Sequence, residues 1–170
     1  MDRGVDTIKL YELLQRLQKE AALEGGRVVR TLGNHELMNM VGDWRYVHPA
    51  DIDTFGGKKQ RMQAFSPEGW IGGDLVQLNL TAKVGNSVFC HGCIHPNFAK
   101  DGLDALNTKT RETIMDYIES RGRLDPHGVF GGRGPTWYRG YALDDNICPT
   151  LEKALDDLKV NAYFKAVEMR

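Results

Sequence analysis

Two histidines each lie shortly after an apolar run and within two residues of a glycine. The tetrapeptide Gly-Asn-His-Glu at 33–36 comes directly after the apolar run 28–32, and His91 comes directly after the apolar run 87–90. A side-chain amide beside an imidazole suits a metal ion and a general acid. Taken alone, such a pair is typical of a turn residue beside a half-buried histidine. Two predicted strand ends that each bring a histidine into a loop favour an α/β enzyme site.

The first half of the chain predicts a helix, a strand and an irregular segment. Apolar residues recur at i, i+3, i+4, i+7 and i+11 over 10–21, which predicts a helix that ends at Gly25. The run 28–32 predicts a strand, the second half of a βαβ unit. The polar segment 37–65 predicts short helices and loops that cover the site, as a substrate lid would.

The second half predicts a hairpin and two helices. The strands are expected at 76–84 and 87–94, joined by Gly-Asn at 85–86, a dipeptide that tolerates the backbone of a tight turn. Apolar spacing predicts helices around 103–118 and 151–158. His91 then lies at the end of the second strand of the hairpin.

Composition favours one ordinary domain over residues 1–170. The chain has 22 basic and 23 acidic residues, so no excess of positive charge favours nucleic acid or anionic lipid as a partner. No apolar stretch approaches the ~20 residues of a membrane span, and no signal-like segment begins the chain. We therefore expect a cytoplasmic location.

The three cysteines point away from a disulfide framework and toward a reducing compartment. Cys90 and Cys93 form a Cys-x-x-Cys pair, which keeps a thiol redox protein open as an alternative. The favoured interpretation is a buried strand cysteine at 90 and a small loop residue at 93.

Several motifs resemble those of the calcineurin-like metallophosphoesterases. Within them the chain is most similar to the phosphoprotein-phosphatase branch, in particular the Shewanella-like protein phosphatases. Residues 2–4 (Asp-Arg-Gly) look like the tail of the family's Gly-Asp-x-x-Asp-Arg-Gly motif, 33–36 match its Gly-Asn-His-Glu, and 91–92 match its His-Gly. Residues 135–140 resemble the segment that carries an additional phosphate-binding arginine. The resemblance runs from residue 2 to about residue 160.

The resemblance implies a fold, a cofactor and a substrate class. The fold is α/β, a metallophosphoesterase-type sandwich of two mixed sheets flanked by helices, here incomplete at both ends. The cofactor is a pair of divalent metal ions, Mn, Fe or Zn, that activates water for attack on phosphate. The substrate is a phosphorylated protein or a small phosphoester.

The resemblance also implies roles for individual residues. Asn34 and His91 bind one metal ion, and His35 is the general acid that protonates the leaving oxygen. Asp2 holds the imidazole of His35 in orientation, because a carboxylate behind a histidine fixes its tautomer.

Two arginines complete the implied site. Arg3 and Arg139 bind the phosphate, since a guanidinium group matches phosphate oxygens bidentately. Surface or capping roles are the alternative for each of them.

Some of the family's motifs are not found. Asp-x-His is absent, the first Asp of the second motif would precede residue 1, and no Gly-His follows Val160. Residues 161–170 thus replace the expected strand and ligand, and only the neutral ligands Asn34 and His91 remain. Two divalent ions need anionic oxygen between them, so we expect the chain alone to bind two metals poorly and to be inactive or weakly active. Cys93 also replaces a glycine, where it could crowd the loop or coordinate metal.

Two hypotheses follow. The first is a metal-dependent phosphatase of which this chain is a truncated piece, with open sheet edges and marginal stability. The second is a non-catalytic phosphatase-like module that binds a partner or a phosphorylated ligand through Arg3, His35 and Arg139.

Overall fold

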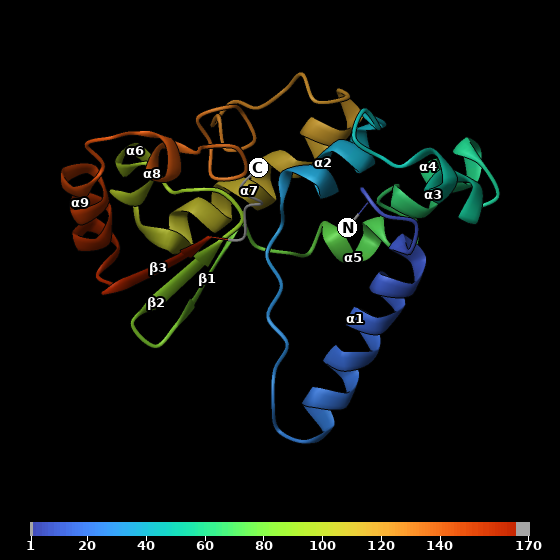
Figure 1. Cartoon of the computed structure of the whole chain (residues 1–170), viewed down its shortest axis with the longest axis horizontal. Coiled ribbons are helices and arrows are strands. Elements are labelled where there is room, and N and C mark those ends of the chain that lie inside the picture. Colours follow the sequence, from blue (N-terminus) through green and yellow to red (C-terminus); the bar gives the residue numbers. More distant parts are fainter. Residues whose placement is uncertain (1, 166–170) are drawn as a thin grey trace.

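A single mixed sheet lies at one end of the molecule in the computed structural model, which describes residues 2–165 (side chains through residue 162). Its strands are β1 (Thr81–Val84), β2 (Ser87–Cys90) and β3 (Ala162–Lys165), in the order β1-β2-β3. β1 and β2 pair antiparallel, whereas β2 and β3 pair parallel with Ser87 opposite Ala162. In Figure 1 the sheet lies beside α7, and α1 forms an arm that extends away from it.

The helices are short apart from three. They are α1 (Thr7–Leu23), α2 (Asn34–Val41), α3 (Pro49–Thr54), α4 (Lys58–Phe65), α5 (Gly72–Leu75), α6 (Pro96–Ala99), α7 (Gly102–Glu119), α8 (Gly140–Leu143) and α9 (Cys148–Leu158). The three long ones, α1, α7 and α9, are the helices that apolar spacing predicts. The hairpin turn at 85–86 is also confirmed.

The predicted strand 28–32 is only partly formed. Its backbone is extended, but within residues 2–165 it makes one parallel bridge, between Thr31 and Asn79. The Leu32 amide donates to the Asn79 carbonyl at 2.9 Å. A single bridge is too short to count as a ladder, so the prediction of a regular strand is wrong for the described part of the chain.

Two further strand predictions are corrected. The first hairpin strand begins at Thr81 rather than at residue 76, because the residues before it form α5 and a turn. The expectation that no strand follows Val160 is wrong, since β3 pairs with β2 there. Over residues 2–165 the architecture is mixed α/β with one sheet, and the second sheet of a sandwich stays a prediction.

The core joins the sheet to α2, α4 and α7. Fully buried apolar side chains from these elements and from the loops between them form one cluster, which includes Leu37, Phe65, Val88, Leu106 and Ile114. Because residues of α2 and α4 belong to this cluster, the segment 37–65 is part of the body of the molecule. The expected short helices are present, and the interpretation of the segment as a lid stays a prediction.

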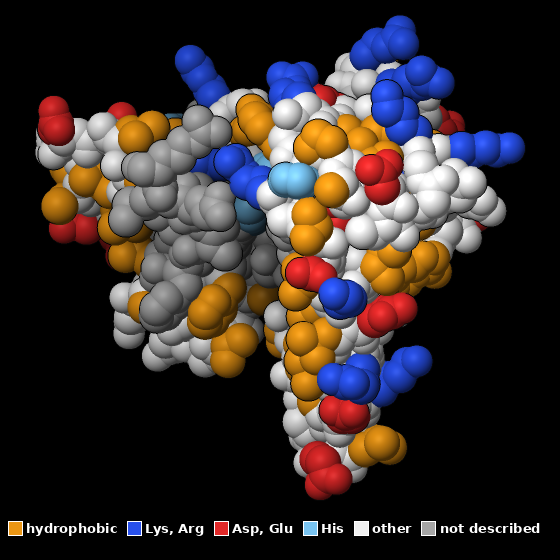
Figure 2. Space-filling model, turned by 45° about the vertical axis from the view of Figure 1, so that its right-hand side comes forward, with side chains coloured by type: hydrophobic (Ala, Val, Ile, Leu, Met, Phe, Trp, Pro, Cys, Tyr) orange, Lys and Arg blue, Asp and Glu red, His pale blue; other side chains and the backbone are white. Residues whose placement is uncertain are grey.

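The arm formed by α1 is less well covered. The predicted apolar face of α1 is not buried: Leu13 and Leu17 remain 38% and 39% exposed, and Tyr11 makes the main contact with the core. Hydrophobic side chains accordingly lie along this arm in the space-filling view (Figure 2). We infer that the arm contributes less to stability than the part around the sheet.

Candidate active site

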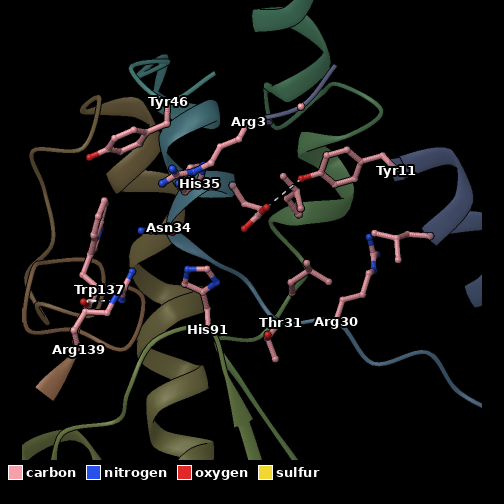
Figure 3. Close-up of a pocket in the computed structure, with 15 residues that line it drawn as sticks. Arg3, Tyr11, Arg30, Thr31, Asn34, His35, Tyr46, His91, Trp137 and Arg139 are labelled. Atoms are coloured by element: carbon pink, nitrogen blue, oxygen red, sulfur yellow. Dashed lines mark hydrogen bonds between the residues drawn. The ribbon is translucent and has the colours of Figure 1, made fainter. Parts of the chain in front are cut away.

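A cavity of about 630 Å³ brings the predicted site residues together. Five of them line it, namely Arg3, Asn34, His35, His91 and Arg139, and they come from segments far apart in the sequence. Their side chains surround a common space in Figure 3, and histidine and basic side chains lie side by side in Figure 2. The sixth residue, Asp2, is buried behind His35.

Asn34 and His35 are the first residues of α2, not the last residues of a strand as the sequence predicts. Gly33 is the N-cap residue, and its amide donates to the Glu36 carboxylate at 3.1 Å. The unpaired amides at a helix N-terminus favour negative charge nearby. The start of α2 therefore suits an anionic ligand in this cavity.

Gly33 also allows the two histidine motifs to meet. A Cβ atom built at this position would lie 2.6 Å from Glu36 Oε2 and 2.7 Å from His91 Nδ1. Any other residue would force one of these side chains to move. The Gly-Asn-His-Glu and His-Gly motifs are thus in contact through a backbone that has no room for a side chain.

The Asp2 carboxylate holds the ring of His35. Asp2 Oδ1 lies 2.6 Å from His35 Nδ1, and Asp2 Oδ2 accepts a hydrogen bond from Asn39 Nδ2 at 2.6 Å. Burial raises the pKa of Asp2, but the hydrogen bonds from His35 and Asn39 outweigh it and hold the pKa below its ordinary value. An ionised Asp2 accepts the proton on Nδ1, so Nε2 is the ring nitrogen left for chemistry.

One aromatic ring packs beside this pair. The ring of Tyr46 stacks on His35 at 5.3 Å between centroids and 22° between planes. The guanidinium of Arg3 lies 5.3 Å from the centroid of the same Tyr46 ring. Tyr46 thus fixes the position of both side chains at the cavity wall.

Asn34 and His91 have the properties of neutral ligands. Asn34 Oδ1 is buried and has no hydrogen-bond partner among the described residues. Burial, and then the charge of Arg139, lowers the pKa of His91 to about 4, so its imidazole is neutral near pH 7. A cation would satisfy the amide oxygen, and a neutral imidazole is the form that binds metal.

This pair fits a metal ion only as part of a ligand set. No cluster of three or more His, Cys, Asp or Glu side chains that could hold a metal is found among residues 2–165. Both candidate ligands are also uncharged, so neither offsets the charge of a divalent ion. Asn34 and His91 thus fit one side of a metal site, and a complete site would need anionic ligands besides these two residues.

The loop that carries Arg139 is attached to the end of β2. The Gly92 amide donates to the Pro135 carbonyl at 2.8 Å, and the Cys93 amide donates to the Tyr138 carbonyl at 2.9 Å. A Cβ at Gly92 would collide with the Pro135 carbonyl. These contacts place Arg139 and His91 at the same cavity.

Arg139 itself is oriented within that loop. Its Nη1 donates to the Trp137 carbonyl at 2.8 Å, and both residues line the cavity. Together with Arg3 it gives the cavity two guanidinium groups.

The cysteines lie behind the site. Cys90 and Cys93 are buried, which confirms the favoured interpretation of both. Cys93 is not among the described residues that line the cavity, and whether it crowds the loop or coordinates metal stays untested.

Three buried polar residues beside the site are not predicted from the sequence: Asn39, Asp51 and Arg61. Asn39 follows His35 by one helical turn, which is the one signal that could have found it. Arg61 lies in the polar run Lys-Lys-Gln-Arg at 58–61, which looks like a solvated face. Its side chain is nevertheless 0% exposed.

Three comparisons give this geometry a context. An uncharacterized protein of Schizosaccharomyces pombe is 35% identical over 176 residues, which cover 95% of this chain and 51% of that protein. Shewanella-like protein phosphatase 2 of Arabidopsis thaliana is 28% identical, covering 93% and 52%. The crystal structure of a cold-active protein-tyrosine phosphatase of a psychrophile Shewanella sp. superposes with a TM-score of 0.81 and 28% identity, covering 96% and 50%.

These similarities support the family of Shewanella-like protein phosphatases, and the fold is that of the Shewanella enzyme over the matched part. The chain spans about half the length of the curated relatives it matches. No family profile matches it. Within residues 2–165 no helix is long and apolar enough to cross a membrane.

Proposed function

We propose that this chain belongs to the Shewanella-like protein phosphatases, in the calcineurin-like superfamily, and takes part in the hydrolysis of phosphate monoesters. One observation carries the proposal: two guanidinium groups, a carboxylate-held histidine and two neutral ligand side chains meet at one cavity. Phosphoryl transfer depends on positioning and on electrostatic stabilisation, and these side chains can supply both.

The arginines bind the phosphoryl group. Arg3 and Arg139 donate hydrogen bonds to its non-bridging oxygens and offset its charge. The amides at the start of α2 add further donors on the same side. The anion is thereby held against the histidines.

His35 supplies the proton. Water attacks phosphorus and loses a proton as the bond to the leaving oxygen breaks. With Nδ1 engaged by Asp2, His35 Nε2 donates a proton to that leaving oxygen, and the ring becomes neutral. Asp2 keeps the ring in this tautomer throughout and is not itself protonated.

Asn34 and His91 are the residues that would hold a divalent ion, Mn, Fe or Zn. The chemistry that a metal pair supplies in such sites is polarisation of the phosphoryl oxygens and activation of water. The relatives' names suggest the substrate class, a phosphorylated protein such as one carrying phosphotyrosine, with small phosphoesters as simple analogues.

A second function is a non-catalytic module that binds a phosphorylated ligand or partner. It is favoured by the absence of a cluster of three or more metal-binding side chains among residues 2–165. Binding would still use the two arginines and the start of α2.

Hydrolysis and binding of the same chain distinguish the two functions. Turnover of p-nitrophenyl phosphate would be measured with Mn²⁺, and inorganic phosphate binding by calorimetry. We expect Arg139→Gln to weaken phosphate binding about ten- to a hundredfold, because a charge-assisted hydrogen bond contributes about 1.5–3 kcal/mol. The exposed Arg133→Gln is the matched control.

Each outcome has a clear meaning. Turnover that His35→Gln abolishes supports the phosphatase. Phosphate binding that needs Arg139, without turnover, supports the binding module. Phosphate binding that is the same in Arg139→Gln and Arg133→Gln would exclude this cavity as the phosphate site.

A further inference from the structure

Arg61 in α4 is a charged side chain that is completely buried. Its Nη1 donates to Asp51 Oδ2 at 2.6 Å, and both side chains are 0% exposed. The guanidinium also lies 4.7 Å and 5.0 Å from the ring centroids of Phe55 and Phe65. Burying a charge is costly unless it is paired, so Arg61 should have a role other than keeping the surface soluble.

The other nitrogens of Arg61 hold the amide of Asn39. Nε and Nη2 donate to Asn39 Oδ1 at 3.2 Å and 2.9 Å. A guanidinium has donors and no acceptor, so the amide must present its oxygen to Arg61. Arg61 thereby settles which way the Asn39 amide faces.

The amide nitrogen of Asn39 then faces the site. Nδ2 donates to Asp2 Oδ2 at 2.6 Å and to the His35 carbonyl at 2.8 Å. Asp2 has its other carboxylate oxygen against His35 Nδ1. We call the side chains of Asp51, Arg61, Asn39, Asp2 and His35 the relay.

We propose that Arg61 is a positioning residue for His35: it fixes the Asn39 amide, which fixes the Asp2 carboxylate and, through it, the orientation and tautomer of the His35 ring. The proposal rests on the function proposed above, in which His35 is the general acid. Without a cation at position 61 the Asn39 amide is able to rotate, and its oxygen would then repel the Asp2 carboxylate.

A purely structural ion pair is the simpler alternative, and the chain offers a matched control for it. Arg30 and Asp74 also form a close pair, with both Arg30 Nη atoms 2.6 Å from the carboxylate oxygens. Arg30 lines the same cavity. Among the described residues its hydrogen bonds go to Asp74 and not to the relay, so its loss should cost stability and leave the Asp2 and His35 pair intact.

The test is proton NMR of the 170-residue chain with ¹⁵N-labelled histidine. A histidine Nδ1 proton bound to a carboxylate gives a low-field resonance, which His35→Gln assigns by its disappearance. We expect Arg61→Gln to remove or shift this resonance strongly, and Arg61→Lys to retain part of it, since an ammonium can still donate to Asn39 Oδ1. Arg30→Gln should leave it unchanged.

A second variant covers the case in which Arg61→Gln does not fold. Asn39→Ser keeps an oxygen that can accept from Arg61 but removes the N–H that binds Asp2. It should weaken the resonance while circular dichroism shows a cooperative thermal transition.

The resonance needs no turnover, so failure of the positioning proposal is distinct from failure of the proposed hydrolysis. A folded Arg61→Gln or Asn39→Ser chain with an unchanged resonance would overturn the positioning role. So would a wild-type chain that shows no low-field resonance at all. In an active sample, a loss in kcat with little change in KM is expected for Arg61→Lys.

Discussion

The two sides of the cavity differ in how their polar groups are satisfied. On one side, the relay passes from Asp51 to His35 through hydrogen bonds of 2.6–3.2 Å, and none of its buried side-chain atoms in the described chain lacks a partner. On the other side, Asn34 Oδ1 is buried with no partner in residues 2–165, and His91 is kept neutral. The fold satisfies the polar groups of the first side, whereas on the second side it leaves a buried oxygen that no described residue satisfies.

The largest effect is expected from Arg61→Ala. This change leaves Asp51 buried without its cation, and breaking a buried pair costs about 3–5 kcal/mol of unfolding free energy. Urea denaturation would measure the loss. Arg30→Ala is the control and should cost about 1 kcal/mol, because Asp74 is 27% exposed and such pairs contribute little. Equal losses in the two variants would remove the distinction between a buried relay and an ordinary ion pair.

Gly33→Ala tests the contact that joins the two sides. The new methyl group would lie within 2.7 Å of Glu36 Oε2 and His91 Nδ1, and such overpacking costs about 1–3 kcal/mol. Thermal unfolding followed by circular dichroism would measure it. At Gly132 a Cβ meets nothing within 4 Å, so Gly132→Ala should change stability by less than about 0.5 kcal/mol. A neutral Gly33→Ala would show that the two motifs are not in contact.

Asn34→Leu is expected to have the smallest effect and the opposite sign. Removing an unpartnered buried oxygen should raise the unfolding free energy in metal-free buffer by about 1 kcal/mol. Added Mn²⁺ should then raise the melting temperature of the wild type and not that of the variant. If Asn34→Leu were destabilising without metal, the amide would have a structural role, and the contrast between the two sides would fail.

The helices and the site motifs could be predicted because their signals are local. The spacing of apolar residues predicts α1, α7 and α9, and the Gly-Asn dipeptide at 85–86 predicts the hairpin turn. The two motifs that contain Asn34, His35 and His91 predict three of the residues that line the cavity, and the family resemblance adds Arg3 and Arg139. The prediction for α1 is only partly correct. Periodicity identifies its apolar face but does not indicate which element, if any, covers that face.

Non-local features could not be predicted from the residues alone. β3 forms because β2 offers it a parallel partner far back in the chain, and nothing in 162–165 gives a strong alternating pattern. Arg61 and Asp51 look like solvent-exposed charges, and their burial depends on α3 packing against α4 and on α4 packing against α2. Contacts between segments far apart in the sequence determine both the formation of β3 and the burial of Arg61 and Asp51.

The parallel pairing of β2 with β3 has a consequence for folding. β2 ends one residue before His91, yet its neighbour β3 follows only after α6, α7, α8 and α9 have been made. Closing so long a loop is entropically costly, and such contacts form late. During synthesis the edge of β2 that pairs with β3 therefore stays exposed until the end of the described chain leaves the ribosome. His91 therefore directly follows a strand whose pairing is completed only when β3 has been made.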